Sequence, residues 1–436
     1  MMIVNDPLLQ KYQKSWQAQF EAKPKDWLQT LRTQQFATFL DQGFPNIRHE
    51  QWKYTNIMPL AEQSFELTQP SSELNRLDDC EHFFMTGAHY RLVFIDGFFS
   101  AELSVTPCNE KFIIMNLAAA IEQHKDLVQK YIAPESNSSA FLNLNTAYIQ
   151  DGVFIYAPAN CVITKPIHVL YLAGSHSVNR VQHIRNIIVA EERANVTFFE
   201  EYQSLVQESY TSNVVTQLQV NTESHVEHIK LQNQNTKSFH VSNTLLSQYK
   251  NSRVSEYSYS LGGQLAREDI CCNLHEEGAS LQLAGLYLPL DKQHIDIHTF
   301  INHLASHTTS DEVFKGVIAA KSRAVFNGKI SVTKKIKQAI ANLQNKNLLL
   351  APDAEVNTKP ELEIYSDDVK CRHGATISTL DKEMLFYLRS RGISADKAHQ
   401  LLLLAFVREN VNAITHASIA DKIHKLIEHK WDELIS

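Results

Sequence analysis

Two residues near the carboxyl end of the chain, Cys371 and His373, carry side chains that bind transition metals. Alternation along the segment 368–374 predicts a strand that places Val369, Cys371 and His373 on one face. A thiolate beside an imidazole suits iron, zinc or an iron–sulfur cluster. A cluster normally needs more ligands than two, so a second chain would have to supply the others. The alternative, which composition alone favours, is a structural cysteine beside a histidine at the rim.

Other polar groupings are weaker candidates. His294, Asp296 and His298 share one face of a predicted strand, where a metal site is conceivable but a polar stripe on the outside of the fold is favoured. Asp367 and Asp368 are adjacent, so in a strand they point to opposite faces and cannot flank one bond. The chain also lacks GxSxG, P-loop, HExxH and GxGxxG motifs. These patterns predict a protein that is not an enzyme.

Composition narrows the class further. Among 436 residues, 41 are basic and 48 acidic, and the net charge of −7 argues against nucleic acid or an anionic membrane as the main partner. The longest apolar run, 401–407, is too short to span a bilayer, and the start does not read as a signal peptide. The six cysteines are scattered without a CxxC pair, so neither a disulfide framework nor a zinc site is expected. We therefore expect a soluble cytoplasmic protein with free thiols.

The elements that would position Cys371 and His373 follow from a repeat. Between about residues 151 and 378, strand patterns follow one another, and a start of small, polar and aliphatic residue recurs as ANV at 194–196, SHV at 224–226, SRV at 252–254, ASL at 279–281 and AEV at 354–356. The first four starts are spaced by 30, 28 and 27 residues. Such a period predicts a stacked solenoid, and its strand content indicates a β-helix with Val196, Val226, Val254 and Leu281 in one internal stack.

Helical patterns flank this repeat. At the start, Asp6 and Pro7 predict the beginning of an amphipathic helix, and a second helix should end at Gly43. The segment 90–99 predicts a hairpin, and 113–132 predicts a further helix. At the carboxyl end, Asp381 and Ser394 are predicted to cap short helices with apolar stripes, which suit either a cap on the solenoid or a docking surface.

A longer set of motifs surrounds Cys371. It comprises NLLL at 347–350, DAEV at 353–356, TKP at 358–360, ELEI at 361–364, DDVKC at 367–371, HGAT at 373–376 and LFYLRSRGI at 385–393. Upstream stand EQWKYT at 50–55, LNTA at 144–147, QHIDIHT at 293–299 and FKG at 314–316. Together they resemble the SufB/SufD family of iron–sulfur cluster assembly proteins, and the SufD branch more than the SufB branch. The resemblance spans nearly the whole chain.

The resemblance implies a fold, partners and site residues. It implies a mainly β protein with three regions: an N-terminal α/β, largely helical region at 1–150, a right-handed parallel β-helix at 151–378 and a C-terminal helical region at 379–436. It implies a non-enzymatic scaffold that pairs with SufB, binds the ATPase SufC and holds no tightly bound cofactor alone. The nascent cluster would form at the interface, where His373, and less surely Cys371, faces the partner. The SufC-binding residues would be Leu385, Phe386, Tyr387, Leu388, Arg389 and Arg391.

Departures and alternatives remain open at this stage. Arg372 stands where the family commonly has a small residue, which would alter charge near the site, and 340–343 is unusually apolar. The SufB-like sister subunit is the nearest alternative, and a β-helix polysaccharide lyase or hydrolase is the alternative from another class. A redox role with reduced flavin is a third alternative, but the chain has no flavin-binding motif. An isolated chain is expected to be capable of pairing with a second copy.

Overall fold

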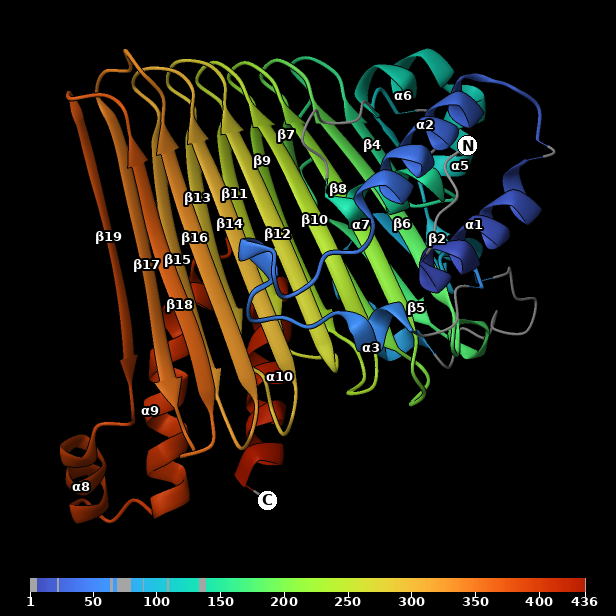
Figure 1. The fold of residues 1–436 in the computed structure, drawn as a ribbon. Coiled ribbons are helices and arrows are strands. Elements are labelled where there is room, and N and C mark those ends of the chain that lie inside the picture. Colours follow the sequence, from blue (N-terminus) through green and yellow to red (C-terminus); the bar gives the residue numbers. More distant parts are fainter. Residues whose placement is uncertain are drawn as a thin grey trace.

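The computed structural model describes residues 6–21, 23–62, 66–68, 80–88, 90–107, 110–132 and 139–435, so Cys108 lies outside the described residues. The protein is mainly β, and its strands stack into a parallel β-solenoid of two facing sheets (Figure 1). The strands are β1 Tyr90–Ile95, β2 Phe98–Val105, β3 Ile113–Asn116, β4 Val153–Ala157, β5 Ile167–Ala173, β6 Val181–Ala190, β7 Asn195–Ser204, β8 Thr211–Val220, β9 His225–Asn233, β10 Phe239–Gln248, β11 Arg253–Ser260, β12 Leu265–Leu274, β13 Ser280–Tyr287, β14 His294–His303, β15 Thr309–Ile318, β16 Arg323–Val332, β17 Ala339–Leu349, β18 Glu355–Ile364 and β19 Val369–Ser378.

Strand order explains the repeat. From β4 onward, even-numbered strands join one sheet of nine and odd-numbered strands join the other sheet of ten, so each turn of the chain contributes one strand to each sheet. All of these neighbours pair in parallel. The predicted solenoid is therefore confirmed.

The recurring start motif marks one corner of the solenoid. In the first four motifs, the residue before the small residue has a left-handed backbone, with φ between 54° and 75°, and the small residue after it is buried. The AEV motif at 354–356 differs, because it begins β18 in the even-numbered sheet and Asp353 before it has no left-handed backbone. The left-handed residue also donates its N–H to the next turn, as Arg193 does to Thr222 and Glu223 does to Lys250. This bond offsets the cost of positive φ at residues other than glycine. The six corners are Arg193–Ala194, Glu223–Ser224, Asn251–Ser252, Gly278–Ala279, His307–Thr308 and Gln338–Ala339.

The aliphatic position of the motif builds the core. Val196 pairs with Val226, Val226 with Val254, and Val254 with Leu281, and all four side chains are buried. They belong to one hydrophobic cluster that runs along the solenoid interior. The predicted internal stack is confirmed, because a parallel register places side chains of equal parity directly above one another.

The amino-terminal end of the solenoid is closed by the chain itself. The hairpin of β1 and β2 forms as predicted and adds to the sheet that begins with β5. The prediction of a helix over 113–132 is wrong for its first turn: Ile113–Asn116 is β3, antiparallel to β4. The β-branched pair Ile113-Ile114 suits a strand, and α5 Leu117–Gln123 and α6 Lys125–Tyr131 follow it.

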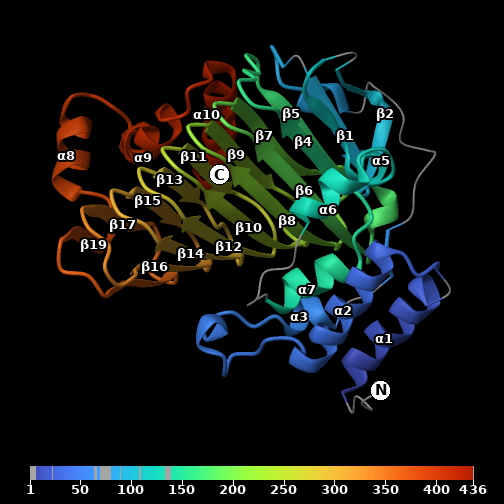
Figure 2. The ribbon, with the colours of Figure 1, turned by 90° about the horizontal axis from the view of Figure 1, so that it is seen from above.

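The amino-terminal helices cover the outer face of the even-numbered sheet (Figure 2). In α1, Asp6 caps the helix and Pro7 begins it, and α2 ends at Gly43, as the sequence predicts. The cap of α2 is Asp26, which the sequence analysis did not identify. Both helices pack with α7 through aromatic residues such as Trp16, Phe36 and Tyr148. The helices are α1 Pro7–Phe20, α2 Trp27–Gln42, α3 Met58–Ala61 and α7 Ala140–Ala147, with short 3₁₀ turns at Glu50–Trp52, Glu81–Phe83 and Ser175–Ser177.

The carboxyl-terminal helices are α8 Lys382–Ser390, α9 Ala395–Asn412 and α10 Ala417–Ile435. Here α9 and α10 lie against the outer face of the odd-numbered sheet, where buried residues such as Leu403 and Ile423 join a cluster with Tyr257 and Leu286. Polar contacts reinforce this packing, for Lys422 reaches Glu201 at 2.5 Å. In contrast, α8 stands beyond the last strands (Figure 1). No helix in the described ranges is long and apolar enough to cross a membrane.

Candidate metal-ligand site and docking helix

The solenoid is open at its carboxyl-terminal end. Strands β18 and β19 are the last members of their sheets, and none of their residues is fully buried. Their inward side chains, including Val356, Leu362 and Val369, are only partly covered, while Ile377 is half exposed. Each strand therefore offers an unpaired edge, and the end of the core is accessible. Pro360 in β18 suits such an edge, because proline has no N–H to donate to a further strand.

Cys371 and His373 lie on this open end. Cys371 pairs with Ala341 and His373 with Leu343 of β17, and both of these partners are buried in the interior. Because paired residues in a parallel ladder share a face, Cys371 and His373 lie on the inward face of the last strand, at the open end of the solenoid. The prediction that the two share one face is confirmed.

Their environments differ. Cys371 is partly buried against the core, and that burial raises the pKa of its thiol. His373 is exposed, and a Cβ built on Gly374 would meet nothing within 4 Å, so another chain can approach the backbone closely. Across the described ranges, no three His, Cys, Asp or Glu side chains converge as metal ligands. The chain thus presents two donor groups at an accessible end, the imidazole being the more available.

Arg372 does not share their face. Its guanidinium Nε donates to Asn342 Oδ1 at 2.8 Å on the outside of the sheet. Its charge therefore lies away from the open interior. The apolar residues at 340–343 divide similarly, because Ile340 is outward and half exposed whereas Leu343 is buried inside.

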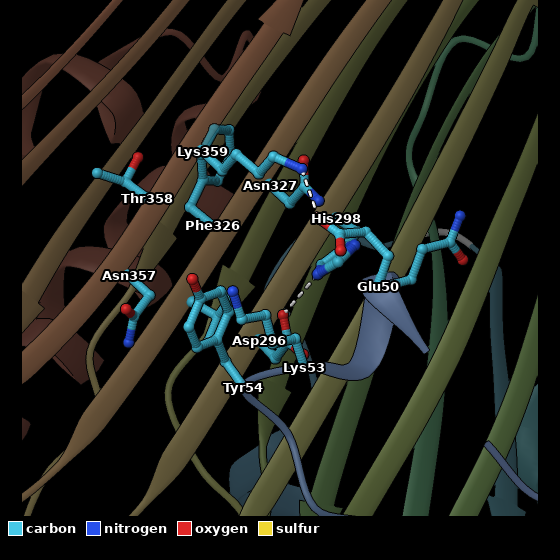
Figure 3. Close-up of a pocket in the computed structure, with 12 residues that line it drawn as sticks. Glu50, Lys53, Tyr54, Asp296, His298, Phe326, Asn327, Asn357, Thr358 and Lys359 are labelled. Atoms are coloured by element: carbon cyan, nitrogen blue, oxygen red, sulfur yellow. Dashed lines mark hydrogen bonds and ion pairs between the residues drawn. The ribbon is translucent and has the colours of Figure 1, made fainter. Parts of the chain in front are cut away.

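The histidine–aspartate trio lies elsewhere, on the outer face of the even-numbered sheet. A strap formed by residues 44–57 crosses this face and covers Asp296, which is 1% exposed. The trio thus lies on the outside of the sheet, as the favoured prediction of an outer polar stripe has it, but the strap covers part of it. Thr55 and Arg267 donate to Asp296, each at 2.5 Å. His298 Nε2 is 3.0 Å from Asp296 Oδ1 (Figure 3). Burial opposes ionisation, but the Arg267 charge holds the pKa of Asp296 well below its usual range.

The strap and this face enclose a small groove. About 200 Å³ of space lies between Glu50, Tyr54, Asn327 and Lys359, next to His298. Lys359 of β18 bonds Glu50 at 2.8 Å and Glu361 at 2.9 Å, so these charges satisfy one another. Trp52 stacks on Arg267, which also fixes the strap. The trio thus anchors the amino-terminal strap to the solenoid and has a structural explanation.

A polar cluster inside the solenoid escaped the sequence analysis. His228 lies between Glu200 and Glu256, 3.1 Å and 2.9 Å away. Burial opposes a charge on His228, yet the two carboxylates raise its pKa to about 9. Two turns on, burial raises the pKa of Glu312 to about 8, and Thr299 donates to it at 2.6 Å. The sequence does hold one sign of this cluster. Glu200, His228 and Glu256 each lie an even number of residues after the inward aliphatic residue of their own strand, so they share its inward face.

The predicted docking residues lie on α8. Phe386 is 75% exposed, Tyr387 52% and Met384 46%, whereas Leu385 and Leu388 are half-buried. Asp381 caps the helix as predicted, and Arg391 stacks on the Tyr387 ring. A helix of nine residues is too short to be stable alone, so its exposed aromatic side chains indicate a surface for another molecule.

Comparison with known proteins identifies the family. Residues 172–406 match the profile of the SUF system FeS cluster assembly SufBD core domain, and residues 3–169 match that of the SufBD protein N-terminal region. The chain belongs to the SufBD family. A SufBD family protein of Synechocystis is 32% identical over 88% of this chain and 86% of the relative.

Two further relatives cover almost the whole chain. The iron–sulfur cluster assembly protein SufD of Escherichia coli is 30% identical over 94% of both chains. The chloroplastic protein ABCI7 of Arabidopsis thaliana is 27% identical over 96% of this chain and 90% of its own. The resemblance inferred from the motifs is confirmed, and this SufBD protein is SufD-like.

Proposed function

We propose that this protein is a non-enzymatic scaffold subunit of a cytoplasmic iron–sulfur cluster assembly complex. The observation that carries the proposal is the open solenoid end, where two bare strand edges surround Cys371 and His373. A SufB-like partner pairs with this end, and the nascent cluster, which is cargo, forms between the two chains. A SufC-like ATPase binds α8 through Leu385, Phe386, Tyr387, Leu388, Arg389 and Arg391.

The number of donor groups supports a shared site. One chain brings an imidazole and a partly buried thiol, whereas a cluster usually takes four protein ligands. The raised pKa of the Cys371 thiol makes it the weaker donor, because only the thiolate binds metal well. The partner therefore supplies the principal thiolate. In isolation, the same apolar end pairs with a second copy of this chain.

Co-purification tests the partners, and a substitution tests the ligand. His373→Ala should leave the melting temperature and partner assembly unchanged, since the side chain is exposed, but should reduce cluster formation on the complex at least tenfold. Cluster formation is followed by absorbance after adding iron and sulfide. Arg372→Ala, one residue away on the opposite face, is the matched control and should retain clusters, and Cys371→Ala should do less harm than His373→Ala. Normal cluster formation in His373→Ala, or its unfolding, would contradict the proposed ligand.

A further inference from the structure

A third polar side chain, that of Thr358, lies at the open end of the solenoid. Thr358 pairs with Phe326 in the even-numbered sheet, and Phe326 is buried in the interior, so the threonine side chain points inward. Of the inward side chains of β18 and β19, two strands described throughout, only those of Thr358, Cys371 and His373 carry an oxygen, sulfur or nitrogen atom. The last turn therefore brings one hydroxyl group to the opening that holds the thiol and the imidazole.

The position of this hydroxyl group is set by a buried amide. Thr358 Oγ1 lies 2.8 Å from Oδ1 of Asn345, which is fully buried on β17. Asn345 pairs with Ala375 of β19, and Ala375 is the next inward residue after His373 on that strand. Thr358 thus lies across the interior from β19, one inward position beyond His373.

Two backbone carbonyl groups decide which atom donates in this network. A carbonyl oxygen only accepts, so Asn345 must present Nδ2 to Phe314 O, at 3.3 Å, and Asn347 must present Nδ2 to Thr376 O, at 3.4 Å. Asn345 Oδ1 then accepts from Asn347 Nδ2 at 2.6 Å and from Thr358 Oγ1. The single hydrogen of the Thr358 hydroxyl group is therefore committed to the interior. Its oxygen keeps lone pairs, and no donor in the described part of the chain uses them.

His373 has the complementary requirement. Among the described residues, none forms a hydrogen bond with its ring. A histidine that ligates a metal through one ring nitrogen ordinarily donates the N–H of the other nitrogen to an acceptor, which fixes the tautomer and the orientation of the ring. Of the two polar side chains that share its opening, the Cys371 thiol is a weak acceptor, whereas the Thr358 oxygen is available only as an acceptor.

We propose that Thr358 is a positioning residue for His373, whose ring N–H it accepts while the other ring nitrogen binds the cluster. The exposed imidazole does not make this bond in the chain alone, and we expect the bond to form when the partner covers the end and turns the ring inward. The buried amides behind Thr358 then hold the acceptor in one place. This inference rests on the proposed function, because it assumes that His373 is a ligand at the interface.

Cluster assembly on the purified complex with the partner tests the proposal, with ferrous iron and sulfide as the probe. Thr358→Val keeps the shape and removes the acceptor, while Asn345 Oδ1 still accepts from Asn347, so the variant should keep its melting temperature. We expect about tenfold less cluster, the effect of losing the acceptor behind a ligating histidine. Thr358→Ser retains the hydroxyl group and should assemble clusters normally. Thr376→Val, the same change on the exposed outward face of β19, is the matched control.

A spectroscopic measurement separates positioning from packing. Pulsed electron paramagnetic resonance of the reduced complex detects the remote ring nitrogen of a ligating imidazole, and the quadrupole coupling of that nitrogen depends on the hydrogen bond of its N–H. The coupling should change in Thr358→Val but not in Thr358→Ser or Thr376→Val.

The outcomes distinguish this inference from the proposed function. Normal assembly with an unchanged nitrogen coupling in Thr358→Val would overturn the positioning role, and loss of clusters in His373→Ala would then leave the proposed function intact. Equal impairment of Thr358→Val and Thr358→Ser would also overturn the positioning role, because the hydroxyl group would not be the feature that matters. Absence of any imidazole coupling in the wild-type complex would show that His373 is not a ligand and would overturn both.

Discussion

The two ends of the solenoid are built from the same repeat but finish differently. At the amino-terminal end, β3 runs antiparallel on β4, the hairpin β1–β2 covers β5, and Val153, Phe154 and Ile155 are buried. At the carboxyl-terminal end, no further strand of the described part of the chain pairs with β18 or β19, and neither strand has a fully buried residue. One end is completed by its own chain, and the other is left open.

This difference shows what a stacked fold requires. Each turn buries its apolar face against its neighbours, so an end turn needs a cover. Antiparallel strands and helices provide it on one side, and natural proteins rarely leave the other edge bare without a use for it. The metal-binding side chains occur at the bare end, where a covering chain would meet them directly. The least buried turn of the solenoid is therefore also the turn that carries the proposed metal ligands.

The largest expected effect comes from placing the same charge at each end. Ile155→Lys, inside the closed end, should lower the free energy of unfolding by more than about 4 kcal/mol, because a fully buried site would receive an unpaired ammonium group. Ile377→Lys, half exposed at the open end, should change it by no more than about 0.5 kcal/mol. Denaturant unfolding of the isolated chain measures both. Equal losses would show that the two ends are equally covered.

A pH series sharpens the contrast between the interior and the open end. Because the folded pKa of Glu312 is about 8 against 4.5 in the unfolded chain, the folded state keeps a proton that the unfolded chain releases. The contribution of Glu312 to stability should therefore fall by roughly 3 to 5 kcal/mol as pH rises from 4.5 through 8, and His228, whose pKa is raised to about 9, should add a separate loss toward higher pH. Glu312→Gln should remove the Glu312 part of this fall and be more stable than the wild type at pH 8. Superimposable pH profiles of the two proteins would contradict a buried, protonated carboxyl group.

The smallest effects compare two positions of one ladder. Val226 and Cys371 stand in the same internal column, joined through Val254, Leu281, Ser310 and Ala341. Val226→Ala should cost about 1 to 3 kcal/mol, since it leaves a cavity in a closed turn. Cys371→Ala should cost less than about 1 kcal/mol, because solvent reaches the last turn. Thermal melts of both variants test this order, and a larger loss for Cys371→Ala would refute it.

Much of the fold was predictable, and the reason is periodicity. The spacing of Ala194, Ser224, Ser252 and Ala279 predicts the turns, and the alternation around Cys371 predicts its shared face with His373. The buried carboxylates were not predictable in the same way, because Glu200 and Glu256 look like ordinary solvated strand residues until their inward register is known. The contacts of Trp52 with Arg267 and of Thr55 with Asp296 also join positions more than 200 residues apart, which no local pattern reveals.

The sequence by itself determined the repeat length of the solenoid turns and several helix caps. It also determined that Cys371 and His373 share one face of a strand, and it carried a family resemblance that the comparisons confirm. Each of these depends on spacing along the chain, which local backbone geometry converts directly into direction. Only the tertiary structure decided that Arg372 points outward, that Asp296 is covered, that α9 and α10 lie against the sheet, and that α8 does not. Those outcomes depend on which distant surfaces exclude water from one another, and a linear pattern does not contain that information.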